Sequence, residues 1–215
     1  MAPIGITLWE RSWYIRSMED LMADMMGDDD RASLLLDRVA GAATQRMQAA
    51  ARAGVDLVHL GDDIGMQSSP MMAPEFWEKW LKPRLRDVIA AGREINPRLM
   101  VFYHSCGYVM PFIDGLIEIG VDILNPVQPE SMAFDEVHAR FGGRLSFWST
   151  IGTQTTLPYG SPEAVREAVW SNLRTCGDAG GIVIGPTHMV EPEVPWENLV
   201  ALKEACESFL ASRKG

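Results

Sequence analysis

The amino-acid sequence predicts an α/β fold of the (β/α)8 TIM-barrel class. Short apolar runs alternate with amphipathic helical segments, and this alternation is typical of βαβ units and a parallel sheet. Polar side chains follow the end of nearly every apolar run, as in a barrel whose active site is assembled from the loops after its strands. No G-x-G-x-x-G pattern follows any run, which disfavours the competing doubly wound sheet.

Five apolar runs are expected to form strands that are buried on both faces. They cover residues 55–60, 99–103, 121–124, 145–148 and 181–184, and a shorter run at 4–8 resembles the remnant of a sixth strand. A complete barrel has eight strands and typically about 250 residues. We therefore expect an incomplete barrel that lacks its N-terminal strands. Because no linker interrupts the alternation, residues 1–215 are expected to form a single domain.

Four segments carry clear helix signals, at residues 31–53, 74–95, 162–176 and 196–212. Three aspartates precede the first segment, where carboxylates suit the positive end of the helix dipole. Pro74 opens the second, at a position where proline is favoured. Ser161 precedes Pro162 as an N-cap of the third, and Pro195 precedes the fourth.

The composition excludes several classes of function. The formal net charge is −10 and the pI about 4.8, so the chain offers no basic face for nucleic acid or for an anionic membrane surface. No apolar run approaches the roughly 20 residues of a membrane-spanning helix, and the N-terminus does not resemble a secretion signal. The three cysteines, Cys106, Cys176 and Cys206, are too few and odd in number for a disulfide framework. A cytoplasmic protein with reduced thiols is expected.

The sharpest chemical signal is His104-Ser105-Cys106-Gly107, which directly follows an apolar run. Alternation along an extended chain points His104 and Cys106 to the same side, and imidazole and thiolate are both suitable zinc ligands. If they share one ion, the ligand atoms must lie within about 4 Å of each other. His188 follows the last apolar run and is expected at the same face, as a third metal ligand or a substrate contact. The alternatives are a buried thiol beside a hydrogen-bonded histidine, and a histidine in a surface loop.

Paired carboxylates at Asp62 and Asp63 are candidate catalytic groups, because carboxylates in a cleft bind cations, share protons or orient substrates. The alternative for either is helix capping or turn formation, and one of the two is expected to do only that. His188 is a further catalytic candidate. The expected substrate contacts are the polar or aromatic side chains at other strand ends: Gln67, Gln128, Trp148, Ser149 and Gln154.

Six motifs occur in order along nearly the whole chain, and together they resemble the uroporphyrinogen decarboxylase superfamily. They are Gly-x-Asp-x-x-x-x-Gly-Asp-Asp-x-Gly-x-Gln at 54–67, His-x-Cys-Gly at 104–107, Asn-Pro-Val-Gln at 125–128, Gly-Thr-Gln-Thr-Thr-Leu-Pro at 152–158, Pro-x-His at 186–188 and Pro-x-x-Pro-x-Glu-Asn at 192–198. The resemblance implies a (β/α)8 barrel enzyme.

The superfamily has two main branches, and His-x-Cys is typical of one of them. That branch contains methyltransferases that move a methyl group between a corrinoid (cobalamin) carried by a partner protein and a small thiol. They bind zinc through His-x-Cys and a later cysteine. Here His104 and Cys106 match the first two ligands, and His188 stands where the later cysteine is expected. The resemblance thus implies a zinc-activated thiol and a corrinoid-protein partner.

Two alternatives remain open. The other branch decarboxylates a tetrapyrrole in porphyrin biosynthesis without a cofactor, and there Asp62 or Asp63 and His188 would contact the substrate. The third possibility is an inactive, truncated barrel. If the barrel is open, a groove along residues 181–184 is expected to be exposed, and the isolated chain is expected to be poorly soluble or a homo-oligomer.

Overall fold

The computed structural model describes residues 1–213, in which six strands form one parallel sheet. The strands are β1 (Ala2–Ile6), β2 (Leu57–Gly61), β3 (Met100–His104), β4 (Ile123–Asn125), β5 (Ser146–Trp148) and β6 (Ile182–Val183). Each strand pairs in parallel with the next one in the chain, so the spatial order equals the sequence order. This order excludes the doubly wound sheet, in which the strand order reverses, and confirms the predicted βα alternation.

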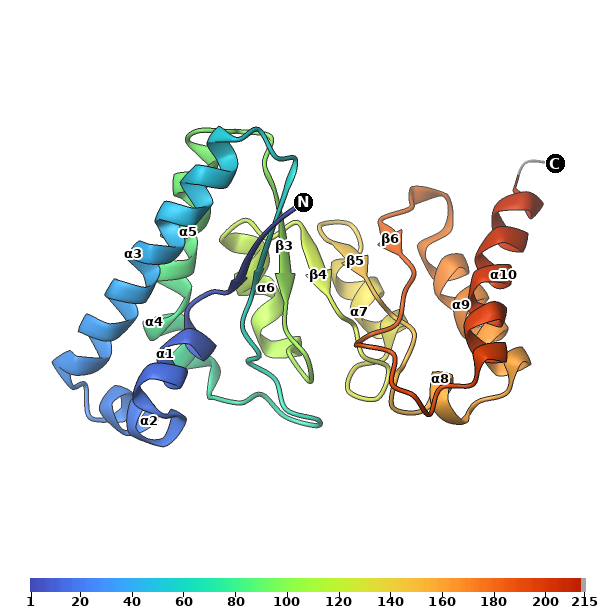
Figure 1. The fold of residues 1–215 in the computed structure, drawn as a ribbon, viewed down its shortest axis with the longest axis horizontal. Coiled ribbons are helices and arrows are strands. Elements are labelled where there is room, and N and C mark those ends of the chain that lie inside the picture. The colour runs from blue at the N-terminus through green and yellow to red at the C-terminus, as the bar shows by residue number, and fades with distance from the viewer. Residues whose placement is uncertain (214–215) are drawn as a thin grey trace.

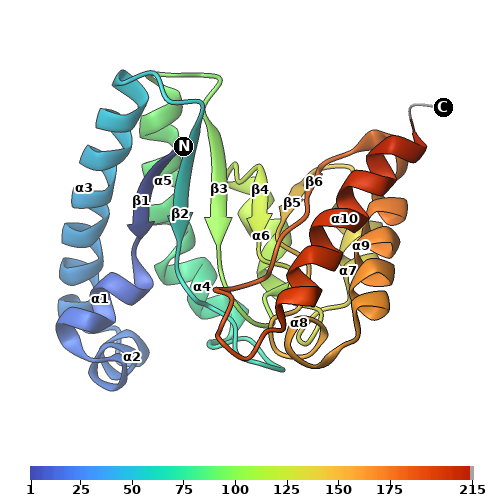
Figure 2. The ribbon, with the colours of Figure 1, turned by 45° about the vertical axis from the view of Figure 1, so that its right-hand side comes forward.

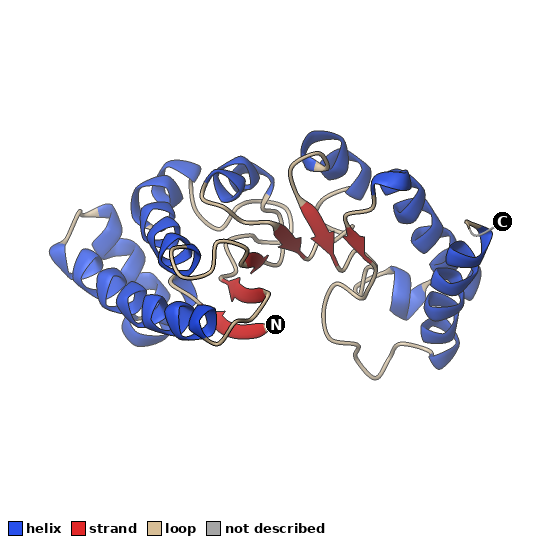
Figure 3. Ribbon diagram, turned by 90° about the horizontal axis from the view of Figure 1, so that it is seen from above, coloured by secondary structure: helices blue, strands red, loops and turns tan. Residues whose placement is uncertain are grey.

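The helices form an outer layer on one side of the curved sheet (Figures 1 and 3). They are α1 (Trp9–Arg16), α2 (Met18–Met26), α3 (Asp30–Arg52), α4 (Pro74–Trp80), α5 (Lys82–Arg93), α6 (Ile113–Glu118), α7 (Phe134–Phe141), α8 (Thr156–Tyr159), α9 (Pro162–Cys176) and α10 (Trp196–Ser212). Two short 3-10 turns, η1 (Met110–Phe112) and η2 (Gly177–Ala179), precede α6 and β6. Within residues 1–213, none of these helices is both long and apolar enough to cross a bilayer.

The expected helix over residues 74–95 is wrong in one respect, because it is divided into α4 and α5 at Leu81. Pro83 has no backbone N–H and cannot donate to the carbonyl one turn earlier, so a continuous helix loses a hydrogen bond here. The other expected helices are confirmed to within a few residues. Ser161 caps α9 by accepting a hydrogen bond from the amide of Ala164.

The sheet is part of a barrel and is open on one side (Figure 2). Among the described residues, β1 and β6 each have only one neighbouring strand. Apolar side chains that a closed barrel would bury are therefore half exposed on the concave face: Val183 is 46% and Met100 is 44% exposed. The structure is thus an incomplete barrel, and the expected exposure along β6 is seen at Val183.

The convex face of the sheet is covered by two apolar clusters. The larger joins α3 and α5 to β2 and β3 through fully buried side chains such as Leu36, Met47 and Val101. The smaller lies under α9 and α10 and contains Val165, Val169 and Ala205. Because the helices pack on the convex face, the polar loops after the strands are left free to line a site at the carboxyl ends of the strands.

A buried carboxylate connects the first βα unit to the second. Asp62, 2% exposed, follows β2 and accepts hydrogen bonds from the backbone amides of Leu8 (2.9 Å), Glu10 (3.0 Å) and Thr7 (3.2 Å) at the start of α1. In return the Glu10 carboxylate accepts a hydrogen bond from the backbone amide of Asp63 at 3.1 Å. Asp62 therefore caps α1 across the sheet, the role that aspartate takes at helix N-termini.

We expect Asp62→Ala to lower the free energy of unfolding by about 2–4 kcal/mol, because three backbone amides, two of them buried, lose the carboxylate to which they donate. Urea unfolding followed by far-ultraviolet circular dichroism would measure it. Asp87→Ala is the matched control, because that carboxylate is exposed and, within residues 1–213, forms an ion pair with Arg86 alone. An equal, small effect of both substitutions would contradict the capping role of Asp62.

Candidate metal centre

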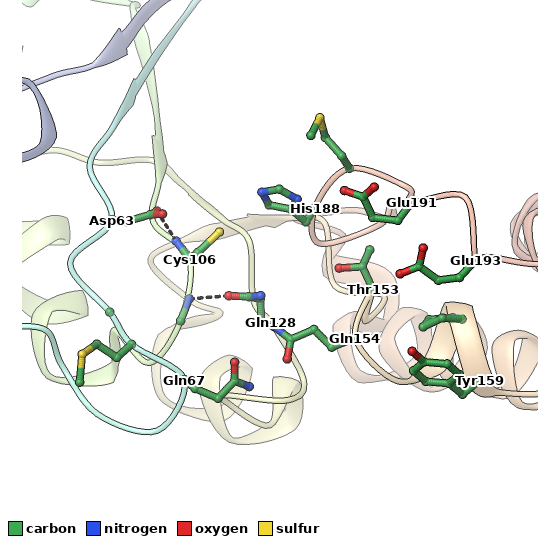
Figure 4. Close-up of a pocket in the computed structure, with 15 residues that line it drawn as sticks. Asp63, Gln67, Cys106, Gln128, Thr153, Gln154, Tyr159, His188, Glu191 and Glu193 are labelled. Carbon is green, nitrogen blue, oxygen red and sulfur yellow. Dashed lines mark hydrogen bonds between the residues drawn. The ribbon is translucent and has the colours of Figure 1, made fainter. Parts of the chain in front are cut away.

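A cleft of about 610 Å³ opens at the carboxyl ends of the strands, where the βα loops meet. Its lining includes several of the expected site residues: Asp63, Gln67, Cys106, Gln128, Gln154 and His188. Figure 4 shows them on two walls, with Asp63 and Cys106 on one side and His188 on the other. The loops after β2 and β3 form the first wall, and the segments after β5 and β6 form the second.

The first wall exists because two glycines let its loops touch backbone to backbone. A Cβ on Gly65 would lie 2.7 Å from the Cys106 carbonyl oxygen, and a Cβ on Gly107 would lie 2.5 Å from the Met66 carbonyl oxygen. Gly107 also has a φ of +81°, a conformation that residues with a side chain rarely adopt. The glycines in the two motifs thus position the metal-binding candidates against each other.

Three ligand-type side chains converge on this wall. The Cys106 sulfur lies 3.5 Å from His104 Nε2, and His104 Nε2 lies 3.6 Å from Asp63 Oδ1. One ligand atom from each of the three lies within 4.8 Å of the others. The sulfur–nitrogen distance agrees with the separation of about 4 Å or less that was expected for ligands of one ion.

Hydrogen bonds leave the correct nitrogen of His104 free for such a role. Its Nδ1 lies 2.7 Å from the side-chain oxygen of Asn125, and the Asn125 amide nitrogen donates to the Trp148 carbonyl at 2.8 Å. Because the second bond orients the amide, Asn125 presents its oxygen to His104 and accepts the Nδ1 proton. Nε2 therefore keeps its lone pair and faces Cys106 and Asp63, an arrangement common for metal-binding histidines.

The electrostatic surroundings keep Cys106 protonated when no cation is near. Burial raises the pKa of the Cys106 thiol to about 12, and the negative charges of Asp63 and Glu10 add to the increase. Burial also raises the pKa of the half-buried Glu10 carboxyl, and it raises that of Asp62 to about 7 against the opposing effect of the backbone amides. A cation bound among these groups would lower the pKa of the Cys106 thiol and favour the thiolate.

The donor set fits zinc. Tetrahedral ligands that lie about 2.0 Å (nitrogen) and 2.3 Å (sulfur) from one zinc ion are about 3.5 Å apart, which matches the distance between Cys106 and His104. One nitrogen, one sulfur and one carboxylate oxygen are all accepted zinc ligands, and three protein ligands leave a fourth position for a substrate. Asp63 also accepts a hydrogen bond from the Cys106 amide at 2.8 Å, which holds it in place.

The structure places His188 differently from the expectation of a third ligand. It is exposed on the second wall and does not belong to the group of ligand atoms that lie within 4.8 Å of one another. Asp63, rather than His188, completes the group of three ligand-type side chains that lie close together. The expected substrate contacts Gln67, Gln128 and Gln154 all line the cleft, and Gln128 accepts a hydrogen bond from the Gly107 amide.

Three other candidates lie outside the cleft lining. Asp62 is buried against α1, so it is the carboxylate of the pair that acts as a cap. Trp148 packs edge-to-face on Phe102 on the inner face of the sheet, with ring centroids 5.4 Å apart. Ser149 is 8% exposed and adopts a left-handed backbone conformation with a φ of +69°.

Sequence reasoning missed several residues at the site. Asn125 ends β4, and its position directly after an apolar run could have identified it as a partner of His104. Glu10 contacts Asp63 from the first βα unit, which the sequence left unassigned as helix. Glu191, Glu193 and Tyr159 line the second wall, and no sequence pattern distinguishes them from other loop residues.

Comparisons with known proteins agree with this architecture. The family profile described as uroporphyrinogen decarboxylase (URO-D) matches residues 9–209. Uroporphyrinogen decarboxylase of Pseudomonas syringae pv. tomato is 26% identical over 188 residues, which cover 87% of this chain and 51% of that protein. The enzyme of the same name from Coxiella burnetii is 25% identical over 179 residues, 81% of this chain and 46% of the relative. The chain thus spans about half the length of these relatives.

Solved structures share the fold. A methyltransferase from Methanosarcina mazei superposes with a TM-score of 0.75 at 22% identity, covering 93% of this chain and 56% of that one. A xylanase 10B from Thermotoga maritima superposes with a TM-score of 0.54 at 10% identity, over 84% of this chain and 68% of that one. At these identities the similarity concerns the barrel alone. The family match over most of the sequence shows that the chain belongs to the uroporphyrinogen decarboxylase (URO-D) family.

Proposed function

We propose that this protein is a zinc-dependent methyltransferase of the URO-D family, which moves a methyl group between a corrinoid protein and a thiol. The observation that carries the proposal is the convergence of Asp63, His104 and Cys106 on one wall of the cleft. Nitrogen, sulfur and oxygen donors at zinc-like separations have no evident use in a decarboxylase that works without a cofactor. The methyltransferase in Methanosarcina mazei with the same fold supports the reading.

In this proposal each residue has a defined task. Asp63, His104 and Cys106 would hold the zinc ion, and the zinc would supply the charge that removes the proton from a substrate thiol at neutral pH. Asn125 keeps His104 in the tautomer that leaves Nε2 free. Gln67, Gln128 and Gln154 line the space beside the cluster and would position the thiol. The sulfur would then attack the methyl group, which leaves its corrinoid cobalt.

Several finer assignments follow as part of the proposal. The corrinoid would arrive on a partner protein, because the cleft is open to solvent on the side of the barrel rim. Cys106, Cys176 and Cys206 are free thiols, and a ligand cysteine needs a reducing compartment, so we place the reaction in the cytoplasm. His188 would contact substrate from the second wall rather than bind the metal.

The decarboxylase alternative is supported by the names of the curated relatives but not by the charges that this chain, which spans about half the length of those relatives, contributes to the cleft. A uroporphyrinogen carries several carboxylates, which would need cationic side chains to bind. No lysine or arginine lines the described cleft, whereas Asp63, Glu191 and Glu193 do. The carboxylates that this chain contributes would therefore disfavour an anionic tetrapyrrole on this part of the rim.

The first prediction of this proposal concerns the metal. The purified protein should bind one zinc ion, and Cys106→Ala, His104→Ala and Asp63→Ala should each weaken binding on the order of 100-fold or more by removing a ligand. Asn125→Ala should weaken it by about 10-fold to 100-fold, since it only orients His104. Competition with a chromophoric chelator would measure the affinities.

Two control variants sharpen this test. Cys206→Ala removes a half-buried thiol on α10, and His188→Ala removes the exposed histidine of the second wall. Both should leave the zinc affinity within about twofold of the parent. If His188→Ala strongly weakened zinc binding and Asp63→Ala did not, His188 rather than Asp63 would be the third ligand beside His104 and Cys106.

The second prediction concerns the reaction. Zinc-loaded protein should transfer the methyl group of methylcobalamin to a small thiol. The change in corrinoid absorbance would measure the rate of transfer, and mass spectrometry would detect the thioether product. Cys106→Ala should reduce this rate to the uncatalysed level, while Cys206→Ala should not. Release of CO₂ from uroporphyrinogen without methyl transfer would favour the decarboxylase, and neither activity would favour an inactive barrel.

A further inference from the structure

A short segment between β4 and α7, residues 126–131, contacts both walls of the cleft. Within it, the side chain of Gln128 accepts a hydrogen bond from the Gly107 amide of the first wall (Figure 4). The backbone carbonyl of Glu130 accepts a hydrogen bond from Gln67 Nε2, which also belongs to the first wall, at 3.3 Å. The carboxylate of the same glutamate bonds to the second wall. The segment therefore joins two walls that come from different βα units.

The carboxylate of Glu130 holds the loop that begins the second wall. Its Oε1 accepts hydrogen bonds from the backbone amides of Gln154 (3.2 Å) and Thr155 (3.1 Å) and from the Thr155 hydroxyl (2.9 Å). The loop can come this close because Gly152 has no side chain, and a Cβ there would lie 2.9 Å from the Glu130 carboxyl carbon. One oxygen thus fixes the backbone of a loop that brings Thr153 and Gln154 to the cleft.

The segment after β6 holds the same loop from its other side. The Thr153 amide donates to Thr187 Oγ1 at 3.3 Å, and the Thr187 amide donates to the Ile151 carbonyl at 2.9 Å. Thr187 is buried and directly precedes His188, the histidine of the second wall. Both parts of the second wall are therefore bonded to the loop that Glu130 holds.

The second oxygen of this carboxylate argues against a purely stabilising role. Among the described residues, Glu130 Oε2 is buried and has no hydrogen-bond partner. A buried carboxylate oxygen without a partner costs free energy, because it gives up its hydration and gains no bond in return. Glu130 is not among the described residues that line the cleft, so it is not placed to contact a ligand there. The contact between Oε1 and the loop is then the reason for the residue.

We propose that Glu130 is a positioning residue, which sets the place of the second wall relative to the first and thereby the fit of the substrate beside the metal. It would touch neither the substrate nor the zinc ion. The inference rests on the proposed methyltransferase function, in which Gln154 contacts the thiol. The ligands Asp63, His104 and Cys106 lie on the first wall, whose loops have contacts of their own. Loss of the Glu130 carboxylate should therefore weaken thiol binding and spare zinc binding.

Three variants test the proposal: Glu130→Ala, Glu130→Gln and, as the control, Glu136→Ala at an exposed position on α7. In calorimetric titrations of the zinc-loaded protein, Glu130→Ala should raise the dissociation constant of 2-mercaptoethanol about tenfold, because three bonds that hold the loop are lost. Glu130→Gln should stay within about threefold of the parent, because its amide oxygen still accepts hydrogen bonds. Both variants should keep the zinc affinity within about twofold, since all ligands remain. The control should change neither affinity.

Amide hydrogen exchange reports the position of the second wall without any substrate. In Glu130→Ala, the amides of residues 152–156 should exchange about tenfold faster than in the parent, because local bonds that protect them are lost. Residues 104–107 of the first wall should keep the parent rate. A variant that merely destabilised the whole fold would exchange faster in both segments. Glu130→Gln should match the parent in both.

Two results would overturn the proposal directly: parent-like thiol affinity in Glu130→Ala, or unchanged exchange at residues 152–156. A parallel loss of zinc affinity would also contradict it, because Glu130 would then support the whole site. If Glu130→Gln were as weak as Glu130→Ala, the charge rather than the position would be responsible. If the parent binds no thiol, the methyltransferase function fails, and the exchange rates alone decide whether Glu130 positions the second wall.

Discussion

The site depends on the contact between the loops that follow β2 and β3. The hydrogen bond from the Cys106 amide to Asp63 holds the two loops in register, and Gly65 and Gly107 allow their backbones to approach. The same contact places a carboxylate, an imidazole and a thiol on one wall. On the other side of the β2 loop, Asp62 ties the preceding βα unit to the sheet. Of the two adjacent aspartates, Asp62 therefore stabilises the fold and Asp63 belongs to the candidate site.

Much of this arrangement could be predicted from sequence because parallel βα units place their chemistry at strand ends. The apolar runs gave the strands to within a few residues, and His104 and Cys106 were identified from their position after one of them. The sequence indicated that one of Asp62 and Asp63 would only cap a helix or form a turn, but it did not indicate which one. That division depends on contacts with residues 7–10, which are about 50 positions away in the chain.

What sequence could not predict is governed by long-range geometry. His188 follows a strand as His104 does, but the cleft separates their walls, and no local pattern encodes that separation. Glu191, Glu193 and Tyr159 are ordinary surface residue types until the fold turns them toward one cavity. The helix break at Leu81 is different, because its cause, Pro83, can be read from the sequence. The amphipathic pattern around Pro83 nevertheless led to the expectation of one continuous helix.

The central claim is that Asp63, His104 and Cys106 together bind zinc. X-ray absorption at the zinc edge of the loaded protein tests it directly, because sulfur and lighter ligands scatter differently. The account predicts one sulfur at about 2.3 Å with nitrogen or oxygen ligands at about 2.0–2.2 Å, and loss of the sulfur shell in Cys106→Ser. A spectrum without a sulfur ligand, or one unchanged by that substitution, would contradict it.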